Sequence, residues 1–545
     1  MVDCTVLEVE GQYGDCLHLG EIFYRIIERW VDFFCRISFD TLKAEFPSTI
    51  KDALLTEYYR KAEEVLQLEY PITKPPHQAL IDRLNLQLDQ GLPSTQWEWG
   101  RIASQFRDPK NYDFAAGAYS PIDTLLEATM NDPTGKKDPN FRTILNAPVA
   151  RLEPQPTPNQ LSSVTHVVVK DGDTERKIAC KKVAVCAGSI ESAAILLRSA
   201  DGDISNFGTS DDIKTEFGHI TDHHILSVAM PFFYRDMEDR DLIGGMKLQT
   251  DIQFNIVKDG KVVDNTVALA NISLDAVSFL PRNDVSDRLL PMLIIAYIIP
   301  SDLVAANKVE LNPDNEPKIH VTWADVNYFE EKQKVLLDFA VDIMTKVVDV
   351  YNVRFAQVGP NGYQPLLHKI TVNDIQLTQA GAGVVAHELG TIPMPGADGS
   401  GSGGLVDTNL HLKYGWDNVS VCDLSVFPYS AAANPTLTLA ALALRLADHL
   451  SSDSKYSPLT VYNLTGGSVF INMTSSNSST VKLGQDLPCT IDQGSSATWE
   501  IEEREAMYIY DCECAVNFDI QMVYPGTNAM IVNSPPKADN CKCTQ

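Results

Sequence analysis

The sequence predicts an α/β fold with an antiparallel α+β region in its middle and an all-β appendage at its end. Residues 181–188 are predicted to form a buried strand that ends in a tight Ala-Gly turn, and residues 189–199 follow as a helix, which is a common α/β element. Between residues 225 and 376, the patterns of strands and helices alternate, and residues 328–350 are predicted to form an amphipathic helix. After residue 450 the chain becomes rich in Ser, Thr and Asn and carries short strand-like runs.

Length and charge limit the function classes. A chain of 545 residues can form two or three domains with large cores. The formal net charge of −28 argues against partners such as nucleic acid or an anionic membrane surface. The longest apolar run, residues 289–300, has the length of a buried strand and is too short to cross a membrane. We therefore expect no nucleic-acid partner and no membrane partner.

Several of the cysteines lie near the end of the chain. Five of the 11 cysteines crowd there: Cys489, Cys512, Cys514, Cys541 and Cys543. Their C-x-C spacing is not the usual zinc-ligand spacing, so disulfides are the favoured interpretation if the chain is exported. Export is also indicated by glycosylation triplets at Asn271, Asn418, Asn463, Asn472 and Asn477. The first residues, however, have no basic start and apolar core of the kind found in signal peptides.

The N-terminal region, residues 1–140, is expected to be mainly helical up to residue 70. Residues 22–34 and 49–66 both have apolar positions at helical spacing. Further on, Ser120 and Pro121 have the residue types of a helix cap and a first helical position. Residues 141–215 follow with strands at 143–152, 164–170 and 177–180 before the strand–turn–helix already described.

Residues 386–450 organise the rest of the chain. His387 lies in a turn-like run, extended pieces follow at 405–412 and 418–423, and a bend comes at 426–428. Asn434 is a favoured N-cap, Pro435 suits the first helical position, and an apolar helix runs to residue 450. The N-terminus of a buried helix favours an anionic group, which would lie against Asn434 and Thr436. The alternative is a core helix with an ordinary cap.

The amino-acid sequence of residues 386–450 resembles that of a known family. The series HELGT, LVDTNL, VSVCDLSVFP and ANPTLTLAALALRLADHL resembles the C-terminal signature of the glucose-methanol-choline (GMC) flavin oxidoreductases. The run KKVAVCAG, the segment 216–224 and the strand pair 307–311 and 317–321 also resemble family segments. The resemblance covers roughly residues 30–450. It implies a GMC-type FAD-binding domain with an antiparallel-sheet substrate domain.

The resemblance also implies a chemistry and a set of site residues. FAD would be the cofactor, and a sugar or other alcohol would lose hydride from its CH–OH group, with oxygen or a quinone as the final acceptor. His387 would be the catalytic base, and Asn434 would take the second polar role, as in the pyranose-oxidase-like branch. The residues that would bind the cofactor are Val149, Ala187, Gly188, Asp423, Leu424, Asn434, Pro435 and Thr436. For Asp423 the alternative is a carboxylate that caps a turn.

The same comparison divides the chain into regions. Residues 141–215 would belong to the flavin domain, 216–376 to the substrate domain, and 377–452 to the C-terminal signature with the catalytic pair. Residues 456–545 would form a small β-sandwich that the resemblance does not cover. That appendage is either a carbohydrate-binding or packing module, or a stabilising segment without a ligand.

One family feature is missing. Members open with a strand, a G-x-G-x-x-G turn and a helix that hold the ADP half of FAD. Gly11, Gly14 and Gly20 have the wrong spacing and no hydrophobic strand before them, and the match at Gly399, Gly401 and Gly404 lies in a loop without flanking strand and helix. The chain is therefore either an FAD enzyme with a reduced cofactor site or a non-catalytic or truncated remnant of the fold.

Histidines at 219, 223 and 224 raise the question of a metal. Three imidazoles within six residues are unusual, but they lack the helical spacing with a carboxylate that typical metal motifs have. The resembling family uses no metal at this position. We expect no metal site from this local triplet.

Overall fold

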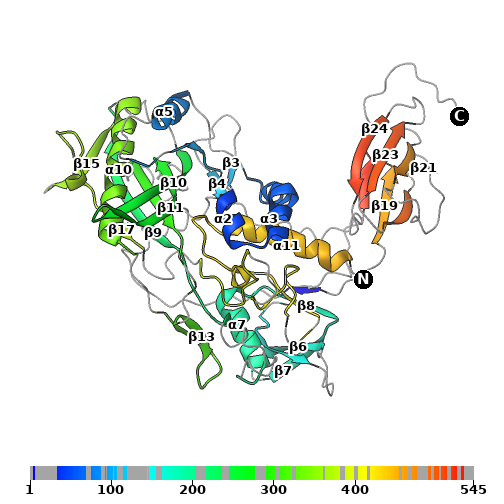
Figure 1. Cartoon of the computed structure of the whole chain (residues 1–545). Helices are drawn as coiled ribbons and strands as arrows, with labels where there is room; N and C mark the ends of the chain where they lie inside the picture. Colours follow the sequence, from blue (N-terminus) through cyan, green and yellow to red (C-terminus); the bar gives the residue numbers. More distant parts are fainter. Residues whose placement is uncertain are drawn as a thin grey trace. The chain divides into compact units, whose positions relative to one another are not determined.

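The computed structural model divides the chain into two compact units, Asp3–Ala443 and Leu444–Gln545 (Figure 1). The residues it describes are 4–6, 34–68, 75–86, 92–93, 95–101, 104–106, 115–118, 144, 146–154, 163–172, 174–202, 216–235, 245–275, 290–301, 303, 306–321, 327–359, 362–380, 387–397, 403–413, 416, 418–452, 457–463, 469–474, 489–491, 496–501, 505–511, 517–523 and 529–532. The expected helix at 22–33, the Ser120–Pro121 helix start, Gly399 and Gly401 lie outside these residues.

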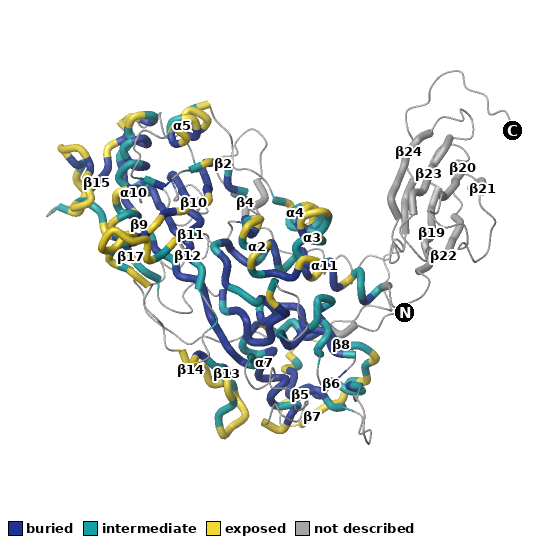
Figure 2. Tube along the Cα trace, in the orientation of Figure 1, coloured by how far each residue is buried: buried dark blue, intermediate teal, exposed yellow. Residues whose placement is uncertain are grey.

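A large antiparallel sheet forms the centre of the first unit. Its strand order is β16 (Gly362–Pro365), β15 (Arg354–Gly359), β9 (His224–Phe233), β12 (Met292–Ile299), β11 (Lys261–Leu274), β10 (Met246–Lys258) and β2 (Glu98–Trp99), and β17 (Thr378–Gln379) also pairs with β9. β9 alternates between more and less buried residues, as expected for a strand with one covered face. β12 is buried almost throughout, which fits the apolar run predicted as a buried strand (Figure 2).

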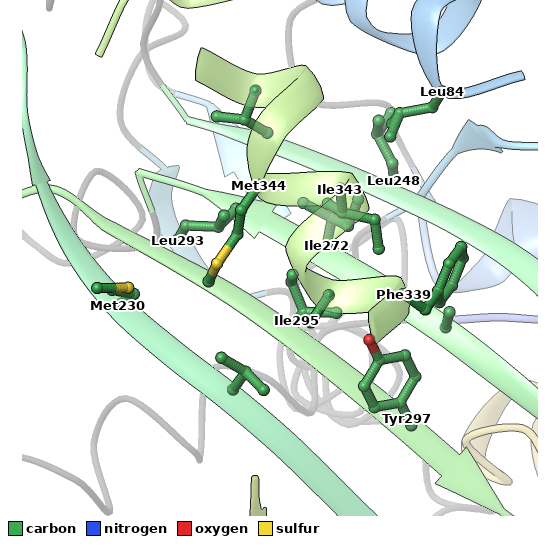
Figure 3. Packing of buried hydrophobic residues seen from close by; sticks show 14 of the residues in the cluster. Leu84, Met230, Leu248, Ile272, Leu293, Ile295, Tyr297, Phe339, Ile343 and Met344 are labelled. Carbon is green, nitrogen blue, oxygen red and sulfur yellow. The ribbon is translucent and has the colours of Figure 1, made fainter. Parts of the chain in front are cut away.

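Helix α10 (Phe329–Tyr351) packs on this sheet. Figure 3 shows Phe339, Ile343 and Met344 of the helix reaching toward Ile295 and Tyr297 of the sheet. The Tyr297 hydroxyl donates to the Leu336 carbonyl at 3.0 Å, so its polar end is paired inside the core. This confirms the amphipathic helix predicted at 328–350 to within one residue at each end.

A small parallel sheet supports the signature region. Its order is β1 (Cys4–Val6), β8 (Lys182–Val185) and β18 (Val419–Val421), and α7 (Gly188–Ser199) follows β8 directly. The antiparallel meander β5 (Val149–Pro154), β6 (Val164–Asp171) and β7 (Thr174–Ala179) confirms three strands in this region, but β5 starts later than the predicted 143 and β7 starts earlier than the predicted 177. The expectation that no strand precedes Gly11 was wrong, because β1 pairs in parallel with β8. A three-residue strand gives too short a pattern to be recognised.

Two short hairpins also belong to the first unit: β3 (Ser104–Phe106) pairs with β4 (Ala115–Ala118), and β13 (Lys308–Leu311) pairs with β14 (Pro317–His320). Short helices precede the sheet in the chain. The helices are α2 (Phe39–Glu45), α3 (Ser48–Ala53), the π-helical turn η1 (Leu54–Tyr58), α4 (Tyr59–Val65) and α5 (Pro75–Asn85). The second unit contains one sheet in the order β22 (Ser496–Ile501), β19 (Ser457–Asn463), β25 (Ala529–Val532), and another in the order β21 (Cys489–Ile491), β20 (Val469–Thr474), β23 (Glu505–Asp511), β24 (Asn517–Val523). Among the described residues, no helix has both the length and the apolar character needed to span a membrane.

Candidate active site

A short antiparallel pairing joins two distant segments at the candidate site. The Thr221 N–H donates to the Leu389 carbonyl at 3.1 Å, and the Leu389 N–H donates back to Thr221 at 2.9 Å. Partner positions in an antiparallel pair move in opposite directions along the chain, and side chains two residues apart share a face. Position 223 therefore lies opposite position 387.

The two histidines at these positions contact each other. His387 Nδ1 and His223 Nε2 are 2.8 Å apart, a hydrogen-bond distance, and their ring centroids are 4.7 Å apart. The residues are only 4% and 2% exposed, respectively. Burial lowers the pKa of His387 to about 4. Burial also lowers the pKa of His223 well below its ordinary value, His387 and His224 add to this, and a backbone contact with Ala431 opposes it.

The low pKa values leave both imidazoles neutral at pH 7, so each ring carries one proton and one lone pair. One of the two facing nitrogens must donate to the other. Among the residues that the structure describes, the second ring nitrogen of His387, Nε2, has no hydrogen-bond partner. If His387 donates through Nδ1, its Nε2 holds a lone pair that can accept a proton.

Backbone contacts fix the segment that carries His387. The Ser189 hydroxyl donates to the Glu388 carbonyl at 2.6 Å, and the Thr391 hydroxyl donates to the Ser189 carbonyl at 2.6 Å. Gly390 has φ +89°, and a Cβ placed there would lie 2.3 Å from Leu303 Cδ2. Only glycine fits without strain at such a position, so the histidine is presented by a turn with one defined shape.

Asp423 ties the parallel sheet to α7. Its Oδ2 accepts from the Gly188 N–H at 3.0 Å and from the Ser192 hydroxyl. Its Oδ1 accepts from the Ser425 N–H at 2.9 Å, which caps the short 3₁₀ turn Leu424–Val426. Burial raises the pKa of this carboxyl, and the hydrogen bond from Ser192 is the largest opposing effect. Both oxygens thus bind protein groups, as a turn-capping carboxylate does.

Of the other predicted cofactor residues, Ala187, Gly188 and Leu424 lie at this connection, whereas Val149 lies at the opposite end of α7. Ala187 and Gly188 form the turn into α7, where Gly188 has φ +81° and open space beside its α-carbon. The glycine is therefore needed for its backbone angle. The Leu424 carbonyl accepts from the Gly390 N–H at 3.1 Å. Val149 begins β5, and its carbonyl accepts from Arg198 at 3.4 Å.

Asn434 precedes helix α11 (Thr436–Ser452) and is 5% exposed. The Leu439 N–H donates to the Pro435 carbonyl at 2.9 Å, so Pro435 occupies the cap position. The cap thus lies one residue later than predicted for Asn434. The Asn434 N–H donates to Cys35 Sγ at 3.3 Å, and Thr438 of the first turn shares a 2.9 Å hydrogen bond with Tyr59. The start of this helix is therefore fixed by contacts with the N-terminal helical region.

The sequence argument missed His223 as a site residue. The local triplet of histidines was visible, but its partner lies 164 residues away. Only the pairing of Thr221 with Leu389 brings the two imidazoles together. His219 instead forms a backbone β-bridge with Lys308. Burial lowers the pKa of His219, and the charge of Lys308 lowers it further.

A sequence model of the GMC oxidoreductases matches residues 304–443, which include His387, Asp423 and the start of α11. This match agrees with the resemblance found in the sequence and shows that residues 304–443 are similar to a GMC oxidoreductase. The GMC segment thus carries His387, while its imidazole partner His223 lies before the matched residues. The family assignment supports a general oxidoreductase role and an α/β GMC-type fold, as predicted.

Two further comparisons add little. A search of curated proteins gives no match. The solved structures that are similar include pyridoxine 4-oxidase from Mesorbium loti, at 15% identity over 70% of this chain and 71% of that chain, with a TM-score of 0.43.

Proposed function

We propose that this GMC oxidoreductase oxidises the CH–OH group of a sugar or another alcohol with FAD as its cofactor. The observation that carries the proposal is the buried, neutral imidazole of His387, whose Nε2 has no hydrogen-bond partner among the described residues. It lies within the segment that matches the family. Oxygen or a quinone would serve as the final electron acceptor.

The residues present fit the redox-active half of FAD. The first turn of α11 is preceded by buried residues, Asn434 and Pro435, and its free N–H groups favour negative charge. Thr436 starts this turn. These groups would hold the flavin ring, and Ala187 and Gly188 would lie along the cofactor. Asp423 is available to the cofactor only if it gives up one of its hydrogen bonds to the protein.

The chain's own residues would handle the proton. His387 Nε2 would take the hydroxyl proton of the alcohol, and His223 would hold the ring in place through the hydrogen bond at Nδ1. Asn434 would donate a hydrogen bond to the same alcohol oxygen. Bound FAD would supply the two-electron acceptor (hydride to flavin N5), so that loss of a hydride and a proton would convert the alcohol to a carbonyl compound.

The test combines cofactor binding with turnover. The full-length protein is mixed with FAD and freed of excess cofactor, and its visible spectrum is recorded. Sugars and aryl alcohols are then supplied with oxygen or a quinone, and the carbonyl product is measured. We expect retained flavin absorbance and product formation that falls about 10²–10⁴-fold in His387→Gln. His320→Gln, at an exposed histidine, is the matched control and should keep full activity.

Two results would overturn the proposal. A protein that stays colourless after FAD treatment would favour the remnant hypothesis, in which the fold survives without catalysis. Equal turnover in His387→Gln and in the parent would remove the base assignment.

A further inference from the structure

One cluster in the first unit has the composition of a metal site. Asp222, His223 and His387 each offer a ligand atom, and these atoms all lie within 4.8 Å of one another. The three residues are at most 4% exposed. A buried set of one carboxylate and two imidazoles is the ligand set of many transition-metal centres.

The backbone holds this cluster in place. Asp222 and His223 directly follow Thr221, and His387 lies two residues before Leu389, its backbone partner. The Ser301 hydroxyl donates to the Asp222 carbonyl at 2.5 Å and shares a 2.7 Å hydrogen bond with the Thr221 hydroxyl. Both segments are therefore fixed close to the ligand atoms before any ion binds. Such preorganisation favours metal affinity.

The nitrogen–nitrogen distance is compatible with one type of coordination. Two nitrogens each about 2.0 Å from a metal are about 2.8 Å apart at a right angle and about 3.3 Å apart at a tetrahedral angle. The observed separation of His387 Nδ1 and His223 Nε2 is 2.8 Å. This is also the distance of the hydrogen bond between the two rings, so an ion with its nitrogens at a right angle would replace that hydrogen bond without separating them.

We propose that Asp222, His223 and His387 bind one divalent transition-metal ion of the first row, with water or another small ligand completing its coordination. Imidazole ligands favour this class over Mg²⁺ and Ca²⁺, which prefer oxygen. A metal at His387 Nδ1 places the ring proton on Nε2. The metal-bound histidine then has no lone pair left to act as a base.

The proposal is independent of alcohol oxidation. Metal binding is measured on the protein without FAD and without alcohol, so a failure of the proposed oxidation leaves this test unaffected. If both proposals hold, the same ion inhibits the FAD-loaded enzyme, because His387 cannot serve both purposes at once.

The experiment uses Co²⁺ with the full-length, metal-free protein. Equilibrium dialysis gives the stoichiometry, and the visible spectrum of Co²⁺ gives the ligand field. We expect the parent to bind one Co²⁺ per chain. Asp222→Asn and His223→Gln should each bind Co²⁺ with an affinity at least about tenfold lower, because replacing even a hydrogen-bond partner of a metal ligand lowers metal affinity about 10–100-fold. His219→Gln, four residues before His223, is the matched control and should retain the ion.

Several outcomes would overturn the proposal. A folded parent that binds no Co²⁺ contradicts it, and so does a stoichiometry that is unchanged in His223→Gln. Circular dichroism shows whether the variants fold. Should both variants unfold, electron paramagnetic resonance of the parent with one equivalent of Cu²⁺ decides: coupling to two imidazole nitrogens supports the site, and any other number of nitrogens refutes it.

Discussion

The central sheet with α10 and the junction around His387 are both buried, but they are filled with different chemistry. The sheet is closed by apolar side chains such as Ile295, Ile343 and Met344. The junction between residues 219–224 and 387–394 instead buries His223, His387, Asp222 and Thr391. Apolar burial stabilises a fold at about 25 cal/mol per Å², whereas burying polar groups costs free energy unless they are paired. The sheet therefore supplies stability, and the junction retains groups that can react.

This comparison predicts the largest loss of stability in the sheet. Phe339→Ala removes a ring that stacks on the Trp97 ring, with ring centroids 6.2 Å apart, and that packs against Tyr297. We expect the free energy of unfolding to fall by about 3–5 kcal/mol, measured by denaturant titration. Val358→Ala, at a position that is 80% exposed, should change it by less than about 0.5 kcal/mol. A similar loss of unfolding free energy in both variants would contradict the claim that apolar burial in the sheet supplies the stability.

The buried His387 of the junction should make the stability of the protein depend on pH. Burial lowers the pKa of His387 from 6.5 to about 4, so between these values the unfolded chain binds a proton that the folded chain does not. Stability is therefore complete above about pH 6.5 and falls as the pH drops toward 4, by about 3 kcal/mol for this residue. Thermal melts across this range should show a shallower fall in His387→Gln and an unaltered fall in His320→Gln. Parallel curves for the parent and His387→Gln would contradict the assignment.

A smaller effect is expected from the turn that presents His387. Gly390→Ala forces an alanine into φ +89° and brings its Cβ 2.3 Å from Leu303 Cδ2. We expect a loss of about 1–3 kcal/mol in the free energy of unfolding. Gly188→Ala has a similar backbone angle but open space, so its loss should be smaller. Equal losses would show that the contact with Leu303 relaxes freely.

The helix on the central sheet and one buried strand were predictable from the sequence, but the strand order and the junction were not. Helix α10 follows from helical periodicity and strand β12 from a continuous apolar run, and each pattern lies within one short window of the sequence. His387 was singled out by its resemblance to a family signature. Its pairing with His223 depends on the register between segments 164 residues apart, which no local pattern encodes. The strand β1 was missed because its three residues are too short a pattern, and its partner β8 lies far along the chain.

The roles of the predicted cofactor residues remain predictions. Ala187, Gly188 and Asp423 lie around one connection between the small parallel sheet and α7, whereas Val149 contacts Arg198 at the other end of α7. Sequence resemblance located this connection, but the hydrogen bonds that occupy both oxygens of Asp423 became visible only in the structure.

The most direct test of the central claim, that His387 is the base of an alcohol oxidation, is rapid mixing without oxygen. The FAD-loaded protein is mixed with its best alcohol, and the loss of flavin absorbance is followed in the parent and in His387→Gln. The account predicts rapid bleaching in the parent and bleaching slower by at least about 100-fold in the variant, with FAD still bound. Equal bleaching rates in the two proteins would contradict it.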